Sequence, residues 1–347
     1  MPTRIHFFVH VETKMNNVVQ FAFILFALFI TGCEKERPIT PVDDSSVSTN
    51  ESDEGNTKVS LLLNWTPEAE HGGFYAALLN GHYATEGIEV TIVPGGKNAP
   101  VIQRVATGQD TFGVCNADQI LTGRNQEADV VALLAPIQDS PRCIMVHKSS
   151  GITSLDQLND MTLAMSGGRS FAVYMQKHLP LENVEIVPYQ PISIFLEDKN
   201  FGQQGYVFSE PFVAQQNGAE PHVLMVSDLG FNPYTSILFT TGDRISSDPA
   251  LVEKMTSASK KGWQDYLDDP TKTNEYIHSI NEQMSVEALA FGAAAIKPLS
   301  LTEGMSSEQI GMMTTQRWQT LLDQLAEIDH ADASLDINDA FISVAVE

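Results

Sequence analysis

Apolar residues after residue 58 follow a regular alternation of short runs and longer stretches with helical spacing. The short runs have the length and composition of strands, and the stretches between them return an apolar residue every three or four positions. The predicted order is strand 59–64, helix 73–80, strand 89–93, helix 100–107, strand 111–115, helix 117–126 and strand 130–135. Strands that alternate with helices predict a largely parallel sheet with helices on both faces.

The alternation resumes after a break near residue 150. An apolar strand at 142–147 ends near Ser149-Ser150-Gly151, where we expect the chain to cross into a second lobe. The elements predicted there are helix 154–158, strand 161–165, helix 170–179, strand 184–189, strand 205–208, helix 211–217 and strand 222–226. A turn at 230–233 and a strand at 236–240 mark the return crossing.

The rest of the chain is predicted to be helical, and it returns to the first lobe. Helices are expected at 249–267, 272–283, 286–295 and 306–327. Trp318, Leu321, Leu322 and Leu325 have the spacing of one buried helical face, so we interpret them as core residues. The predicted fold is α/β and two-lobed, each lobe a mostly parallel sheet flanked by helices: 58–147 with 233–347 form lobe I, and 148–232 form an inserted lobe II. Two crossings make a hinge, and the cleft between the lobes is the expected binding site.

The first residues have the pattern of an export signal. The apolar run 21–30 is shorter than a membrane-spanning helix but suits the core of a secretion signal. Ile30-Thr31-Gly32-Cys33 then places small residues before a cysteine, as a lipoprotein signal peptidase requires. We therefore predict a signal peptide at 1–32, lipidation of Cys33 and a disordered tether at 33–57, with translation starting at Met1 or Met15.

Composition narrows the range of partners. The formal net charge of −24 disfavours nucleic acid and anionic headgroups, which leaves small solutes and protein partners. Cys115 and Cys143 lie in apolar, strand-like runs, so they either pair in an oxidising compartment or remain buried free thiols.

Several segments, taken in order, resemble the thiamine-pyrimidine binding family of ABC-transporter solute-binding proteins. They are Leu63-Asn64-Trp65-Thr66-Pro67, Glu70-His71-Gly72-Gly73-Phe74-Tyr75-Ala76-Ala77, Gly81-His82-Tyr83, Gly87-Ile88-Glu89-Val90, Pro94-Gly95-Gly96, Gly113-Val114-Cys115-Asn116-Ala117-Asp118, Ser209-Glu210-Pro211 and Met313-Thr314-Thr315-Gln316-Arg317-Trp318. The resemblance implies type II periplasmic-binding-protein architecture and an aminopyrimidine ligand in the cleft, of formylaminopyrimidine or hydroxymethylpyrimidine type. It also implies ABC permease and ATPase partners, and neither a cofactor nor a metal.

Two residues suit such a ligand. Trp65 follows a strand, where open α/β sheets bind ligands, and offers a stacking surface for a flat ring; the alternative is an interface or core tryptophan. Glu210 ends a strand before a proline-started helix, and its carboxylate can accept from an exocyclic amine; the alternative is a helix-terminus role.

Further candidates lie in the matched loops and at strand ends. His71 is predicted to supply an edge hydrogen bond, unless loop backbone satisfies it, and Tyr75 a second stacking face. Asn116 can reach the cleft from the end of a strand. The remaining candidates are the loop 166–170, whose backbone around Gly168 either binds a polar group or makes a tight turn, and the lower-ranked Tyr189 and Tyr234.

Other functions remain to be weighed. The same superfamily contains synthases that make the thiamine pyrimidine, but their Schiff-base lysine falls on Cys115 here, their histidine on Gln119, and their cysteine-rich stretch on 231–235. We therefore predict that the protein is not an enzyme. Riboflavin, alkanesulfonate or nitrate are alternative ligands; Arg169 is the strong cationic candidate for an anion. Sensing for a membrane receptor is an alternative to transport.

Overall fold

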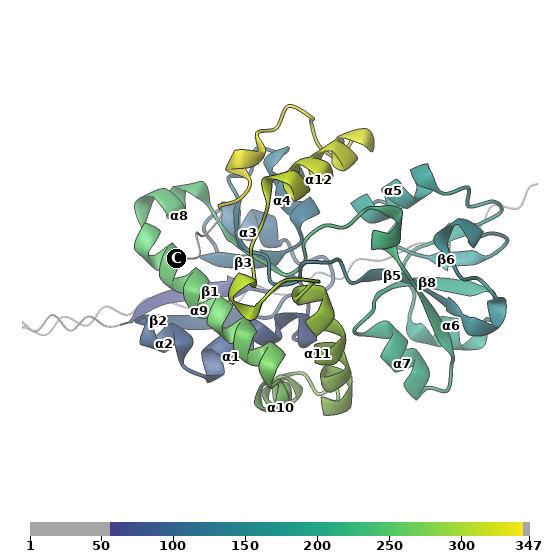
Figure 1. The fold of residues 1–347 in the computed structure, drawn as a ribbon, viewed down its shortest axis with the longest axis horizontal. Coiled ribbons are helices and arrows are strands. Elements are labelled where there is room, and N and C mark those ends of the chain that lie inside the picture. The colour runs from purple at the N-terminus through teal and green to yellow at the C-terminus, as the bar shows by residue number, and fades with distance from the viewer. Residues whose placement is uncertain (1–55, 343–347) are drawn as a thin grey trace, which may run out of the picture. The chain divides into compact units, whose positions relative to one another are not determined.

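The computed structural model describes residues 56–342, so the predicted signal peptide and Cys33 lie outside the described residues. Within them, the chain forms two mixed five-stranded sheets with helices around each (Figure 1). The α/β, two-sheet fold predicted from the alternation of strands and helices is confirmed.

The first sheet has the strand order β2-β1-β3-β10-β4. Its strands are β1 (Thr57–Leu62), β2 (Ile88–Val93), β3 (Phe112–Cys115), β4 (Val131–Leu134) and β10 (Ile237–Thr240). Strand β1 pairs in parallel with β2 and β3, whereas β10 runs antiparallel between β3 and β4. The sheet therefore contains one strand that arrives from a distant part of the chain.

The second sheet has the order β7-β6-β8-β5-β9. Its strands are β5 (Arg142–His147), β6 (Thr162–Ala164), β7 (Glu185–Val187), β8 (Phe201–Tyr206) and β9 (Pro221–Met225). Strand β5 pairs antiparallel with both β8 and β9. The prediction that 142–147 belongs to the first lobe is therefore wrong: these residues form backbone hydrogen bonds in the second sheet, and the first crossing precedes Arg142.

Helices pack around both sheets. They are α1 (Gly72–Leu79), α2 (His82–Thr85), α3 (Val101–Ala106), α4 (Ala117–Arg124), α5 (Ser170–His178), α6 (Ile192–Glu197), α7 (Glu210–Gln216), α8 (Gly242–Ser247), α9 (Pro249–Asp268), α10 (Thr271–Ile280), α11 (Val286–Ser300) and α12 (Thr315–Glu327). The predicted helix 306–327 begins in fact at Thr315, after a 3-10 turn at Ser307–Gln309. In α12, Trp318, Leu321, Leu322 and Leu325 are buried, as their spacing predicts.

The apolar interior is continuous from one sheet to the other. One buried cluster packs β1 against α1 and α9 and includes Leu61, Phe74 and Trp263. A larger cluster contains residues of both sheets, among them Cys115 and Val146. Since apolar burial is the main stabilising contribution to folding, the two sheets share part of their stability.

The two crossing segments, 135–141 and 226–236, are bonded to each other. The backbone N–H of Thr235 donates to the carbonyl of Ile137 at 3.0 Å. The Arg317 guanidinium, on α12, donates to the carbonyls of Gln138 at 2.6 Å and Asn232 at 3.0 Å. Arg317 thus connects both crossings to a helix of the first sheet.

Glycines allow α1 to lie close against α9 (Figure 1). A Cβ atom on Gly73 would lie 2.2 Å from ring atoms of Trp263, and one on Gly72 would lie 2.1 Å from the Tyr266 ring. Gly262 makes the reciprocal approach, because a Cβ there would lie 2.2 Å from the Gly73 carbonyl oxygen. The Gly-Gly pair therefore fixes the start of α1, directly after Glu70 and His71.

We expect Gly73→Ala to lower the free energy of unfolding by about 1 to 3 kcal/mol, the usual cost of overpacking a dense interior. Alanine also favours helix by about 1 kcal/mol, so a net loss isolates the clash with Trp263. Denaturant titration of both proteins measures the change. Gly96→Ala is the matched control, because a Cβ there meets nothing within 4 Å. Equal midpoints for Gly73→Ala and wild type would contradict the close-packing interpretation.

Candidate functional site

Loops at the carboxyl ends of strands from both sheets meet at one place. The loop after β1 carries Glu68 and Glu70, the end of β3 leads to Asn116, and β8 leads to Ser209 and Glu210. The Asn116 amide Nδ2 donates to the Tyr206 hydroxyl at 2.9 Å, across the two sheets. The candidate site is therefore an intersheet cleft, as the fold predicts.

Three glutamates from the two sheets interact at this junction. Glu68 and Glu70 are buried, and Glu70 retains only 1% of its exposure. Burial, with a smaller contribution from the negative charge of Glu210, raises the pKa of Glu70 to about 7. Burial also raises the pKa of Glu68, helped by the charges of Glu70 and Glu210. Near neutral pH Glu70 is therefore close to its pKa, so the glutamate cluster (Glu68, Glu70 and Glu210) exists with this carboxyl group both protonated and ionised.

Arg142 is the cation that faces this cluster. Its guanidinium lies over the Tyr206 ring at 4.0 Å and 4.8 Å from the Phe171 ring. Its charge lowers the pKa of Glu70 and so opposes the effect of burial. The sequence-based choice of a cleft cation was Arg169, and Arg142 was missed because it begins an otherwise apolar strand.

Glu210 is the first residue of α7, but its carboxylate turns back toward β8. Oε2 accepts from the Tyr206 backbone N–H at 2.8 Å, and Oε1 accepts from the Tyr189 hydroxyl at 3.1 Å. The structure thus brings together two residues, Glu210 and Tyr189, that the sequence suggested separately. Tyr206, which joins them to Asn116, was not among the predicted site residues.

His71 is an interior residue that orients the loop. Its Nδ1 accepts from the Glu68 backbone N–H at 3.3 Å, and its Nε2 lies 2.8 Å from the Asn64 Oδ1. Burial lowers the pKa of His71 to about 3, so the ring is neutral and Nε2 carries the proton. Asn64 in turn donates to the Glu70 Oε1 at 3.3 Å. The predicted edge contact of His71 to a ligand is therefore replaced by a positioning role, the backbone-satisfied alternative.

Trp65 and Asn116 have side-chain groups left for a ligand. Trp65 follows β1 and is 38% exposed, which rules out the core-tryptophan alternative. Asn116 precedes α4, and its Oδ1 is buried without a hydrogen-bond partner among the described residues. Since buried polar atoms are nearly always satisfied, this oxygen is a candidate acceptor for a ligand donor.

Tyr75 and Tyr234 lie elsewhere. Tyr75 is buried in the apolar cluster beneath α1, and its ring packs 5.8 Å from that of Tyr276. The Tyr234 ring packs 4.0 Å from the Arg317 guanidinium, and its hydroxyl accepts from the Thr314 N–H at 3.1 Å. The predictions of a second stacking face at Tyr75 and a cleft contact at Tyr234 are corrected: both rings are core residues.

Two cavities open beside the cluster and share the loop residues Gly168 and Arg169. One has a volume of about 520 Å³ and is lined by Lys97, Asn98, Pro188 and Tyr189, among others. The other, of about 440 Å³, lies between α4 and the same loop. Tyr189 lines the larger cavity and also donates to Glu210, so it connects that cavity to the glutamate cluster.

The positions that the pyrimidine synthases use for chemistry are occupied differently here. Cys115 is buried at the end of β3, and burial raises the pKa of its thiol. The Gln119 side chain accepts from the Asn116 backbone N–H at 3.2 Å. Cys115 and Cys143 are both buried free thiols in the described structure, on β3 and β5 respectively, and do not pair.

The missed glutamates left a signal in the sequence. Glu68 and Glu70 are two acids, one residue apart, between an apolar strand and a Gly-Gly helix start. Acids placed where a strand ends at a cleft edge are candidates for ligand contact. What the sequence does not show is that Arg142 and Glu210 of the second sheet lie opposite them.

Comparison with known proteins gives consistent relatives. A family model described as NMT1/THI5-like matches residues 68–273. The chain is 24% identical to the riboflavin-binding protein RibY of Chloroflexus aurantiacus, over 92% of this chain and 94% of that protein. It is 25% identical to the formylaminopyrimidine-binding protein of Halalkalibacterium halodurans, over 42% of this chain and 40% of that protein.

One relative is an enzyme, and a solved structure supports the fold. The chain is 22% identical to the 4-amino-5-hydroxymethyl-2-methylpyrimidine phosphate synthase THI11 of Saccharomyces cerevisiae, over 63% of this chain and 70% of that protein. The periplasmic aliphatic sulphonate binding protein SsuA of Escherichia coli superposes with a TM-score of 0.63, at 12% identity, over 84% of this chain and 94% of that one. The second similarity establishes the periplasmic-binding-protein fold alone.

The glutamate cluster predicts a specific pH dependence. Glu70, with a pKa raised from 4.5 to about 7, holds a proton in the folded protein that the unfolded chain has released. This proton stabilises the folded protein fully below pH 4.5. As pH rises from 4.5 to about 7 the stabilisation should be lost, and the free energy of unfolding should fall by at most about 1.4 kcal/mol per pH unit. His71 acts in the opposite direction below pH 6.5, because its folded pKa is lowered.

The difference between wild type and Glu70→Gln therefore isolates the carboxyl group. Glu70→Gln should gain stability relative to wild type as pH rises from about 5 to 7. Denaturant titrations at several pH values measure this difference. Glu303→Gln, an exposed acid, is the control for loss of one charge. A wild-type-minus-variant difference that stays flat across this range would show that Glu70 is ionised in the folded protein.

Proposed function

The chain belongs to the NMT1/THI5-like family, and on that premise we propose that it is the extracytoplasmic solute-binding component of an ABC importer. Its ligand is a flat nitrogen heterocycle, a thiamine-related aminopyrimidine of formylaminopyrimidine or hydroxymethylpyrimidine type. The observation that carries this proposal is the glutamate cluster, two members of which are buried with raised pKa values.

An aminopyrimidine matches that mixed protonation. Its edge presents a ring nitrogen, which accepts, beside an exocyclic amine, which donates. A protonated carboxyl group can donate to the ring nitrogen, while an ionised carboxylate accepts from the amine. Trp65, which follows β1 and is partly exposed, supplies a stacking surface. A relative named as a formylaminopyrimidine-binding protein supports the same class of ligand.

Riboflavin is the second candidate, because the relative named for it aligns over nearly the whole chain. Its ring system is also flat and has alternating donors and acceptors on one edge. Sulfonate and nitrate fit the site less well. An anion at the bottom of the cleft would meet three carboxyl groups and one guanidinium, Arg142.

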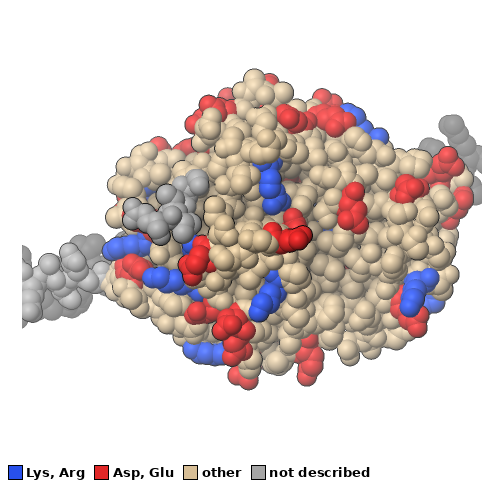
Figure 2. Space-filling view, in the orientation of Figure 1, with Lys and Arg blue, Asp and Glu red and all other residues tan. Residues whose placement is uncertain are grey.

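We place the protein outside the cytoplasm, anchored by lipid on Cys33 and partnered by a permease and an ATPase. The apolar run 21–30 and the small residues before Cys33 support this placement. Within the described residues, none of the helices has the length and apolarity to cross a bilayer. On the face drawn in Figure 2, Asp and Glu occur in separate places, as do fewer Lys and Arg, on a surface made mostly of uncharged residues.

Binding without catalysis is part of the proposal. The position of the synthase lysine is a buried thiol at Cys115, and the position of the synthase histidine is Gln119, engaged with backbone. A Schiff base requires an amine, which neither side chain offers. Incubation with pyridoxal phosphate and iron is therefore expected to give neither a Schiff-base absorption nor a pyrimidine product.

The two ligand contacts should fail in different ways. Trp65→Ala should weaken binding of any flat ligand by about 1 to 3 kcal/mol, the order expected for lost stacking and apolar burial. Glu210→Gln should weaken aminopyrimidines most, because charge-assisted hydrogen bonds are about twice as strong as neutral ones. Calorimetric titration with an aminopyrimidine, and with its analogue lacking the exocyclic amine, separates the roles. An equal loss of affinity for both compounds in Glu210→Gln would show that this carboxylate does not bind the exocyclic amine.

Anchoring has its own test. Cys33→Ala should abolish incorporation of a clickable fatty-acid analogue in cells, because the cysteine sulfur is the atom that carries the diacylglyceryl group. Cys115→Ala, which removes a buried thiol, serves as the control that should still be labelled. Undiminished labelling of Cys33→Ala rejects the lipoprotein assignment while leaving the binding site untouched.

A further inference from the structure

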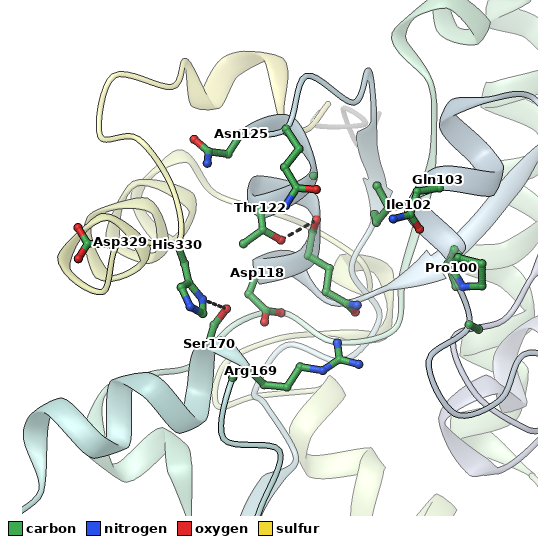
Figure 3. Close-up of a pocket in the computed structure, with 16 residues that line it drawn as sticks. Pro100, Ile102, Gln103, Asp118, Thr122, Asn125, Arg169, Ser170, Asp329 and His330 are labelled. Carbon is green, nitrogen blue, oxygen red and sulfur yellow. Dashed lines mark hydrogen bonds between the residues drawn. The ribbon is translucent and has the colours of Figure 1, made fainter. Parts of the chain in front are cut away.

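The cavity of about 440 Å³ contains a carboxylate and a guanidinium that do not meet. Asp118, in the first turn of α4, projects into it from one side, and Arg169 projects from the loop before α5 on the other (Figure 3). Ser170, on the same side as Arg169, is already hydrogen-bonded to His330 at 3.0 Å. The polar groups left over in this part of the cleft therefore include Asp118 and Arg169.

Asp118 lacks a partner that its burial demands. Its Oδ1 is buried and has no hydrogen bond among the described residues. Arg169 is exposed, and within residues 56–342 its guanidinium has no carboxylate within 4.0 Å. A buried carboxylate oxygen without a donor is costly, so this arrangement is that of a site completed by a ligand.

Burial raises the pKa of Asp118 above its usual value. The positive charges of Arg169 and Arg142 and the N–H groups at the start of α4 oppose that rise without cancelling it. The Arg169 guanidinium is close enough to act on the Asp118 carboxyl group electrostatically, but it forms no hydrogen bond with Oδ1. A group placed between them can therefore donate to Asp118 and accept from Arg169 together.

We infer that this outer part of the cleft binds the tail of the ligand, and that the tail is a neutral group with a donor next to an acceptor. Hydroxyl groups and amides have this chemistry, and Asp118 is the residue that selects it. The inference rests on the proposed function, because it assigns the tail of a ligand whose ring lies at the glutamate cluster. The geometry joins the two parts: Arg169 lines both cavities, and the larger one reaches Tyr189 beside Glu210.

An anionic tail would fit this subsite poorly. A phosphate or sulfonate could accept from Arg169, but at neutral pH it has no proton for the buried Asp118 Oδ1, and it would place negative charge beside this carboxyl group. An apolar tail would bury both charges without hydrogen bonds. The subsite therefore predicts that phosphorylation of the ligand tail abolishes tight binding.

The test compares matched tails on two rings by calorimetric titration. The flavin probes are riboflavin and riboflavin 5′-phosphate, and the pyrimidine probes are hydroxymethylpyrimidine and its phosphate. For whichever ring binds, we expect the neutral compound to bind with an affinity at least about tenfold higher than that of its phosphate. This is the effect of one charged hydrogen bond. Asp118→Asn should weaken the neutral compound and tighten the phosphate, which collapses this ratio. Asp156→Asn, an exposed acid that lines neither cavity, removes the same charge and should leave the ratio unchanged.

The outcomes separate the subsite from the function. If neither ring binds with either tail, the proposed function fails and the tail site fails with it. Two results would reject only the role of Asp118. One is equal affinity for a neutral compound and its phosphate, and the other is an Asp118→Asn variant with an unchanged ratio of the two affinities. Should Asp118→Asn not fold, Asp118→Glu retains the charge and is expected to keep rejecting the phosphate while weakening the neutral compound. Loss of that rejection in Asp118→Glu would also overturn the inference.

Discussion

The burial of Glu68 and Glu70 beside the half-buried Glu210, opposite the Arg142 guanidinium, is the constraint on which the site depends. Glu68 and Glu70 come from the first sheet, while Glu210 and Arg142 come from the second. Full ionisation would leave uncompensated negative charge in a region of low dielectric, so the cluster retains protons near neutral pH. The two sheets therefore meet through an electrostatic arrangement that neither could form alone.

Much of the surrounding structure fixes the atoms of this cluster. Gly72 and Gly73 allow α1 to approach Trp263 and Tyr266, and this close packing fixes the position of the preceding loop. Neutral His71 holds the Glu68 backbone and the Asn64 amide, and Asn64 holds Glu70. A buried site that binds polar atoms needs such pre-arranged support, because reorganising it on binding would reduce affinity.

The sequence predicted the alternation of strands and helices and several site residues. It did not predict which residues of the two sheets lie next to each other. Strand 142–147 was recognised by its apolar run, yet its sheet depends on pairing with β8 and β9, which no local pattern encodes. Strand β8 itself, Phe-Gly-Gln-Gln-Gly-Tyr, is polar and glycine-rich, so only its end was predicted. One of its glutamines, Gln204, accepts from the Ser166 N–H at 2.6 Å and supports the cleft loop. Arg142 escaped notice because its role depends on the opposite sheet.

The tie between the crossing segments limits how the two sheets can move. Arg317 bonds to both crossings, and the Thr235 N–H bonds one crossing to the other. Two connections joined in this way bend as a single axis, so opening has one principal direction and twisting is resisted. A membrane partner that contacts both lobes at once would then sense occupancy as a single angle, and the lifetime of the closed state would set the rate of ligand delivery.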